Sequence, residues 1–169
     1  MTILKLILKY TDLLVSVTEQ INRPQSVIFY KDDENRFKTR FTLKLKTCSA
    51  YVITIEIKPS LQMSYMKLGS TKYDQPSSKS NSSEEGKCLY KFNWSTEGID
   101  ITERKYRTIV PCAIKFRGYK ELNFKLSVKF YGCEKNIHYN GIPFTSVCLD
   151  GVLVNNKESR GHLFHVIFT

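Results

Sequence analysis

Apolar and polar residues alternate with a period of two over much of the chain. The alternation is clearest in three runs, Phe41–Lys46, Tyr51–Lys58 and Leu122–Tyr131, where every second residue is apolar. A period of two is typical of a β-strand with one buried face and one face in water. β-Branched and aromatic residues fill these runs, in agreement with their strand propensity.

Seven weaker strand candidates occupy much of the remaining sequence. Turn signals such as Lys58-Pro59-Ser60, Arg117-Gly118 and Asp150-Gly151 separate several of the runs. The weaker candidates are Leu14–Glu19, Val27–Tyr30, Leu61–Leu68, Leu89–Ser95, Ile109–Phe116, Phe144–Leu149 and Leu163–Phe168. About ten strands at such spacing predict an all-β fold, an antiparallel β-sandwich or flattened barrel.

Two segments depart from the alternation. In the segment Ile3–Leu14, the polar residues Lys5, Lys9 and Asp12 would lie on one face of a helix. The same segment can equally lead straight into the first strand, so helix and strand both stay open. The segment Tyr73–Gly86 is rich in Ser and nearly free of apolar residues, which predicts a long mobile hairpin loop.

Composition and charge are typical of a folded protein of the cytoplasm. The chain has 169 residues, of which 41% are hydrophobic and 25% are charged. We expect a single domain spanning residues 1–169, with a core large enough to need no disulfides. No apolar run is long enough for a transmembrane helix, and the N-terminal segment lacks a signal-peptide pattern. Five scattered cysteines without a C-x-x-C motif predict free thiols in a reducing compartment.

Motifs of catalysis and of metal binding are missing from the sequence. It contains no nucleophile elbow, no P-loop, no dinucleotide-binding fingerprint and no H-E-x-x-H pair. The pairs Cys133/His138 and His162/His165 supply too few ligands for a compact metal site. We therefore predict a protein that is not an enzyme and has neither a cofactor nor a metal.

The formal net charge of +10 is the most informative feature of the composition. Lysines recur at outward positions of the strand candidates, and Arg104, Lys105 and Arg107 form a basic cluster in a loop. The outward lysines are Lys44, Lys46, Lys58, Lys125 and Lys129. Such a face attracts acidic peptides or anionic lipid headgroups, or simply keeps the domain soluble. Nucleic acid is not expected, because no RNA-recognition segment is present.

Bulky residues in the inward register suggest a second kind of site. Large side chains from two curved sheets can leave a slot that holds an acyl or prenyl chain, or they can pack closely. The candidate lining residues of such a slot are Phe41, Leu43, Ile55, Phe92, Trp94, Phe124, Leu126 and Phe130. The sequence leaves the slot and the packed core as alternatives.

Several short strings, taken in order, resemble one protein family. They are Ile28-Phe29-Tyr30-Lys31, Arg36-Phe37, Thr42-Leu43-Lys44-Leu45-Lys46-Thr47, Tyr51, Ile57-Lys58-Pro59-Ser60, Ser95-Thr96-Glu97-Gly98-Ile99, Val128-Lys129-Phe130-Tyr131, Gly141-Ile142-Pro143-Phe144 and Asn156-Lys157-Glu158-Ser159. Their order and spacing are similar to the cannabinoid receptor-interacting protein 1 family, over roughly residues 13–160. The loop 73–86 and the tail 160–169 depart from the vertebrate pattern, as expected of a divergent member such as an invertebrate one.

The resemblance implies a non-enzymatic cytosolic β-sandwich, immunoglobulin-like and similar to the cargo domain of Rho GDP-dissociation inhibitors. It implies an adaptor that binds the cytoplasmic C-terminal tail of the type-1 cannabinoid receptor and modulates its signalling. The alternative function is a carrier of a lipid chain or a lipidated peptide. Contact with the anionic plasma membrane also agrees with the charge. Motif residues expected on the surface are the candidate partner-binding residues, namely Tyr30, Lys31, Lys44, Lys46, Lys129 and Tyr131.

Overall fold

The computed structural model describes residues 2–11, 27–34, 36–37, 39–82, 86–132, 137, 140–157 and 163–168. The regular secondary structure of these residues consists of β-strands alone, which confirms the predicted all-β class. The strands are β1 (Thr2–Thr11), β2 (Phe29–Asp32), β3 (Phe41–Lys46), β4 (Ala50–Lys58), β5 (Met63–Leu68), β6 (Thr71–Tyr73), β7 (Ser78–Ser82), β8 (Lys87–Ser95), β9 (Thr108–Phe116), β10 (Leu122–Tyr131), β11 (Ile142–Pro143), β12 (Val147–Val152) and β13 (Leu163–Phe168).

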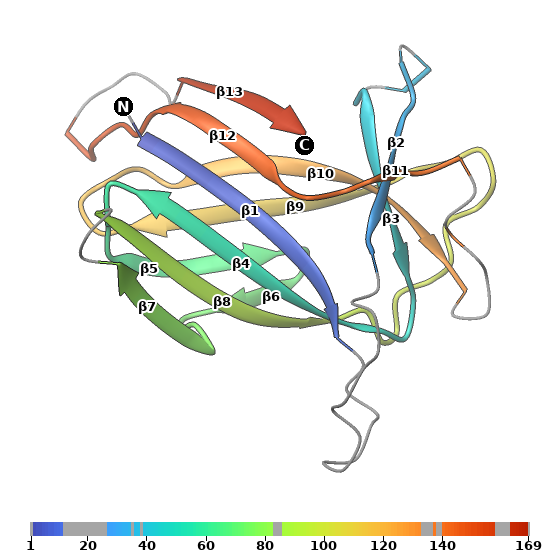
Figure 1. Cartoon of the computed structure of the whole chain (residues 1–169), viewed down its shortest axis with the longest axis horizontal. Helices are drawn as coiled ribbons and strands as arrows, with labels where there is room; N and C mark the ends of the chain where they lie inside the picture. The colour runs from blue at the N-terminus through green and yellow to red at the C-terminus, as the bar shows by residue number, and fades with distance from the viewer. Residues whose placement is uncertain are drawn as a thin grey trace.

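The strands form two sheets that are not closed into a barrel (Figure 1). One sheet has the order β13-β12-β1-β4-β8-β7, and the other has the order β11-β2-β3-β10-β9-β5-β6. Strands β2 and β3 run steeply across the direction of the other strands in Figure 1. The architecture is consistent with the predicted β-sandwich.

One strand pair departs from the antiparallel pattern of the predicted sandwich. β3 and β10 run parallel, with Lys44 beside Lys129 and Lys46 beside Tyr131. The two strands are far apart in sequence, so no hairpin forces them to be antiparallel. The parallel pair brings lysines from distant motifs to the same place on the sheet.

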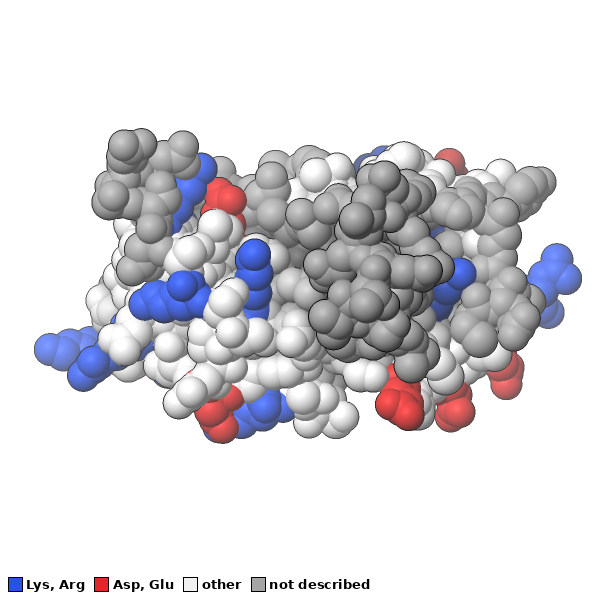
Figure 2. All heavy atoms as spheres, turned by 60° about the horizontal axis from the view of Figure 1, so that its bottom comes forward, with Lys and Arg blue, Asp and Glu red and all other residues white. Residues whose placement is uncertain are grey.

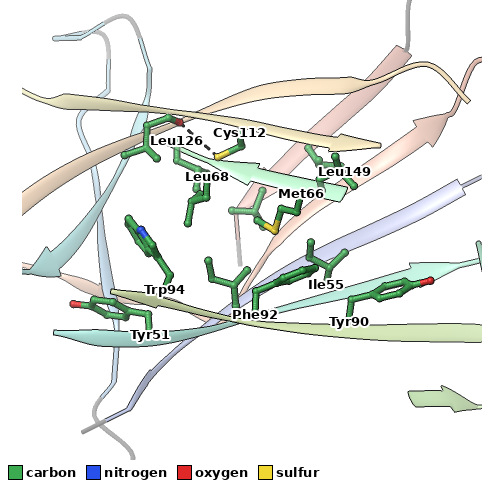
Figure 3. Packing of buried hydrophobic residues seen from close by; sticks show 14 of the residues in the cluster. Tyr51, Ile55, Met66, Leu68, Tyr90, Phe92, Trp94, Cys112, Leu126 and Leu149 are labelled. Carbon is green, nitrogen blue, oxygen red and sulfur yellow. Dashed lines mark hydrogen bonds between the residues drawn. The ribbon is translucent and has the colours of Figure 1, made fainter. Parts of the chain in front are cut away.

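The core lies between the two sheets. Figure 3 shows Phe92 and Trp94 of β8 pointing toward Met66 and Leu68 of β5, and all four side chains are at most 5% exposed. Inward residues of β4, β9 and β10 complete the same hydrophobic cluster. Burial of this apolar surface is the main force that holds the sheets together.

The N-terminal segment is a strand, which decides between the two interpretations left open by the sequence. β1 lies between β4 and β12, where Leu4 is opposite Ile57 on one side and Leu149 on the other (Figure 1). β1 pairs with β4 over Ile3–Thr11 and with β12 over Thr2–Leu6. A helix here would leave the edges of β4 and β12 without these hydrogen bonds.

Six of the seven weaker strand candidates overlap an observed strand, and Leu14–Glu19 lies outside the described residues. Two local predictions are wrong. The segment Tyr73–Gly86 is not simply a loop, because β7 lies within it and pairs with β8. The expected turn at Asp150-Gly151 is part of β12, which pairs with β1 and β13. In both places sheet pairing overrides the local preference of polar residues and Gly for turns.

Gly141 allows β11 to approach β2 closely. A Cβ atom at this position would lie 2.8 Å from the Cβ of Phe29, which is closer than van der Waals contact permits. The close approach fixes β11 beside β2, and β2 carries Lys31 of the candidate site. Any larger residue at position 141 would push the two strands apart.

Candidate functional site

Cationic side chains gather on the outer face of the sheet that contains β3 and β10. The register places Lys44 beside Lys129, and Arg107 directly precedes the residue that pairs with Val128. Lys31 of β2 is opposite Thr42 of β3. Because side chains alternate between the two faces of a strand, these positions share the face turned away from the core.

Asp33 lies at the centre of this group. Its carboxylate accepts hydrogen bonds of 2.9 Å from both Nε and Nη2 of Arg107, and one of 2.6 Å from the Thr42 hydroxyl. Lys31 Nζ lies 3.5 Å from Oδ1 of Asp33. The Asp33 side chain is 0% exposed and the Arg107 side chain 9% exposed, so the pair is a buried ion pair. We call Lys31, Asp33, Lys44, Arg107 and Lys129 the Asp33 cluster.

The hydrogen bonds keep Asp33 ionised despite its burial. Burial alone would raise the pKa of the carboxyl group, but the hydrogen bonds from Arg107 and Thr42 and the charges of Arg107 and Lys31 bring it below its usual value. The Ser127 hydroxyl lies 3.1 Å from that of Thr42 and extends the polar network to β10.

The two central lysines are partly withdrawn from water. Lys44 is 6% exposed, and its ammonium group donates a hydrogen bond of 3.2 Å to the Ile137 carbonyl. Lys129 donates one of 3.0 Å to the Arg104 carbonyl. Burial, and then repulsion from neighbouring cations, lowers the pKa of both lysines. Four cationic side chains therefore surround one described carboxylate, and the local charge is strongly positive.

Aromatic rings flank the cations. The Tyr131 ring lies 5.8 Å from Nζ of Lys44 and 5.6 Å from Nζ of Lys129. The Phe37 ring centroid is 4.1 Å from the Arg107 guanidinium carbon. These cation–π contacts hold the charged groups in place without neutralising them.

The structure unites four of the six candidate partner-binding residues. Lys31, Lys44, Lys129 and Tyr131 belong to the Asp33 cluster or contact it, and Lys46 pairs with Tyr131 in the register. The exposed position expected for Lys44 is wrong, because its side chain is buried and its ammonium group donates to the Ile137 carbonyl. The binding role of the six candidate residues stays a prediction.

Tyr30 lies apart from these residues, and the surface position expected for it is wrong, because its side chain packs against the core. Its ring packs edge-on against Phe41 and Phe144, with centroids 5.7 Å and 6.4 Å away, on the side of the core. Asp33 was missed by the sequence analysis, because an isolated Asp near a turn carries no signal of its partner. Arg107 was recognised only as part of a basic loop.

The candidate slot residues lie mostly in close packing. Six of them are at most 5% exposed in the core, namely Leu43, Ile55, Phe92, Trp94, Leu126 and Phe130. Phe41 and Phe124 are half-buried, and Phe124 lines a hollow with Pro111, Cys112, Asn123 and Lys125. Burial raises the pKa of the Cys112 thiol to about 12, which leaves it protonated at neutral pH.

Charged side chains of both signs lie on the molecular surface. On the face drawn in Figure 2, Lys and Arg side chains are scattered among uncharged residues, and Asp and Glu side chains lie near both its lower and its upper edge. No group of three or more His, Cys, Asp and Glu residues in the described part of the chain could hold a metal ion. The same residues include no helix that could span a bilayer. In the described part of the chain, the Asp33 cluster is a charged group built around a buried ion pair.

Comparison with known proteins agrees with the family resemblance. Residues 10–159 match the family described as CB1 cannabinoid receptor-interacting protein 1. The chain belongs to this family. It is 29% identical over 135 residues to the CB1 cannabinoid receptor-interacting protein 1 of Homo sapiens, covering 79% of this chain and 82% of the human protein. The protein of the same name in Bos taurus is 28% identical over 135 residues, covering 79% of this chain and 82% of the bovine protein. All five residues of the Asp33 cluster lie within the matched range.

Proposed function

We propose that this protein is a non-enzymatic cytoplasmic adaptor that binds the C-terminal cytoplasmic tail of a cannabinoid-type receptor and modulates its signalling. The Asp33 cluster is the proposed binding site. The observation that carries the proposal is the excess of partly buried cations around one carboxylate, in a chain whose relatives are named as receptor-interacting proteins.

The charge excess is unfavourable in the free protein. Lys44 and Lys129 repel each other and Lys31, and burial weakens the solvation of their ammonium groups. An acidic side chain or a terminal carboxylate of a bound tail would relieve both effects. Charged groups whose pKa is shifted by burial and by specific charged neighbours are frequent in functional sites.

Fluorescence anisotropy with a labelled peptide tests the proposal. The probe is the C-terminal cytoplasmic tail of the human type-1 cannabinoid receptor. Lys129→Glu should weaken binding at least tenfold at low salt, because it reverses a charge within the site. Lys91→Glu is the matched control, since Lys91 is exposed on β8 in the other sheet and changes the net charge equally. Equal losses in the two variants would show that net charge, and not the Asp33 cluster, attracts the tail.

One observation favours the alternative function of a lipid-chain carrier. Phe124 is in the inward register of β10, yet it is only half-buried and borders the hollow beside Cys112. An apolar side chain that is both inward and accessible could contact an inserted acyl or prenyl chain.

A comparison of bare and lipidated tail peptides separates the two functions. Trp94 is the single tryptophan and lies in the core, with its ring centroid 5.8 Å from that of Tyr51. An adaptor should bind both peptides alike with unchanged Trp94 emission. A carrier should bind only the lipidated peptide with a shift of that emission, and Phe124→Arg should abolish this binding.

A further inference from the structure

The segment between β8 and β9 exposes more apolar surface than its surroundings. Ile101 is 60% exposed, Tyr106 is 63% exposed and Ile109, at the start of β9, is 44% exposed. Single exposed apolar side chains are common on proteins, but three within nine residues suggest a contact surface. We call residues 101–109 the β9 entry loop.

Basic side chains lie among these apolar groups. Arg104 and Lys105 are exposed between Ile101 and Tyr106, and Glu103 is the acidic residue of the loop. The Arg104 carbonyl accepts the hydrogen bond from Lys129, so the loop is continuous with the Asp33 cluster. The surface thus combines apolar side chains with two exposed basic residues, Arg104 and Lys105, and one acidic residue, Glu103.

Internal hydrogen bonds hold the loop in one shape. The hydroxyl groups of Thr102 and Thr108 lie 2.8 Å apart and close its base. The backbone amide of Thr102 donates to the Phe130 carbonyl at 3.0 Å, and that of Tyr106 donates to the Glu103 carbonyl at 3.1 Å. Polar backbone groups that are already paired lower the cost of moving the loop into a less polar environment.

We propose that the β9 entry loop docks the protein on an anionic phospholipid surface. Aromatic and aliphatic side chains beside basic residues are the combination that peripheral proteins use at the bilayer interface. The exposed Arg104 and Lys105 and the net charge of +10 complement the negative charge of such a surface. The proposal does not depend on tail binding, although both would bring the same face of the protein toward the membrane.

Co-sedimentation with vesicles tests the proposal. The vesicles contain phosphatidylcholine and phosphatidylserine at roughly 7:3, or phosphatidylcholine alone. The wild-type protein should sediment with the anionic vesicles and not with the neutral ones. The double variants Ile101→Ser/Tyr106→Ser and Arg104→Glu/Lys105→Glu should each lower the partition coefficient at least tenfold.

Matched controls separate this loop from nonspecific attraction. Lys58→Glu/Lys91→Glu changes the net charge as much as Arg104→Glu/Lys105→Glu, and Val152→Ser removes an apolar side chain that is 47% exposed elsewhere. Each control should change partitioning less than threefold, within what a distant surface charge contributes at ordinary salt. Equal losses in test and control variants, or equal sedimentation with neutral vesicles, would overturn the proposal.

Tail binding in the same variants distinguishes the membrane proposal from the adaptor proposal. Ile101→Ser/Tyr106→Ser should bind the receptor-tail peptide like the wild type while losing the vesicles. If this variant loses the peptide and the wild type does not bind vesicles, the loop is a protein-binding surface and the membrane proposal is wrong. If vesicle binding behaves as expected and Lys129→Glu leaves peptide binding unchanged, only the adaptor site is wrong.

Discussion

Arg107 donates two hydrogen bonds of 2.9 Å to the carboxylate of Asp33, although 74 positions separate the two residues in the chain. The planar guanidinium group matches the two carboxylate oxygens, so the contact fixes orientation as well as distance. The pair connects the end of the β9 entry loop to the turn between β2 and β3. It also supplies the carboxylate around which Lys31, Lys44 and Lys129 are arranged.

Asp33→Asn should lower the free energy of unfolding by about 3 kcal/mol, because it leaves the buried Arg107 guanidinium group without its counter-charge. Urea unfolding measures this loss. Asp32→Asn is a matched control. Asp32 is the neighbour of Asp33 in the chain and pairs with Arg40, whose side chain is 66% exposed. The control should lose much less stability. Equal losses of unfolding free energy in the two variants would show that burial does not account for the contribution of the Asp33–Arg107 ion pair to stability.

Acid should remove the contribution of Asp33 to the free energy of unfolding. A carboxyl group with a lowered folded-state pKa stabilises the protein above its unfolded pKa, whose ordinary value is 3.8. This stabilisation is lost as the pH falls below 3.8 and through the lowered folded-state pKa. The difference in unfolding free energy between the wild type and Asp33→Asn should therefore be constant near neutral pH and shrink below 3.8. A difference that stays constant to lower pH would contradict ionisation of Asp33 as its source.

Lys44→Met should stabilise the protein and weaken tail binding. Methionine keeps much of the length of the side chain but removes a buried charge that Lys31 and Lys129 repel. We expect a gain of about 1 kcal/mol in unfolding free energy and a roughly tenfold loss of affinity for the tail peptide. Lys58→Met, at an exposed position of β4, should change neither property strongly. Unchanged affinity in Lys44→Met would remove Lys44 from the binding site.

Tail binding should weaken at alkaline pH earlier than ordinary lysines would allow. Burial and neighbouring cations lower the pKa of Lys44 and Lys129 from the usual 10.5, so both lose their charge below that pH. An anionic ligand favours the charged forms, and binding therefore takes up protons in this window. Affinity measured across alkaline pH should fall before 10.5 in the wild type. The double variant Lys44→Met/Lys129→Met should show weaker binding with little change over the same range.

The alternation of apolar and polar residues determined that this chain forms strands, because a period of two suits one secondary structure only. It also determined which residues reach the core, as the burial of Leu43, Ile55 and Phe130 shows. The ordered motifs were sufficient to identify the family. These properties depend on neighbouring residues or on short strings, and both can be read along the chain.

The tertiary structure decided what lies against the outward face. The period of two assigns Lys44 to that face but cannot show that its side chain is buried there and bonded to the Ile137 carbonyl. The β1 segment became a strand because β4 and β12 offer partners on both sides. Asp33 and Arg107 meet only because the parallel pairing of β3 and β10 places β9 close to the β2–β3 turn. Local sequence determines the orientation of each side chain within its strand, whereas the order of strands in the sheet determines which distant charges become neighbours.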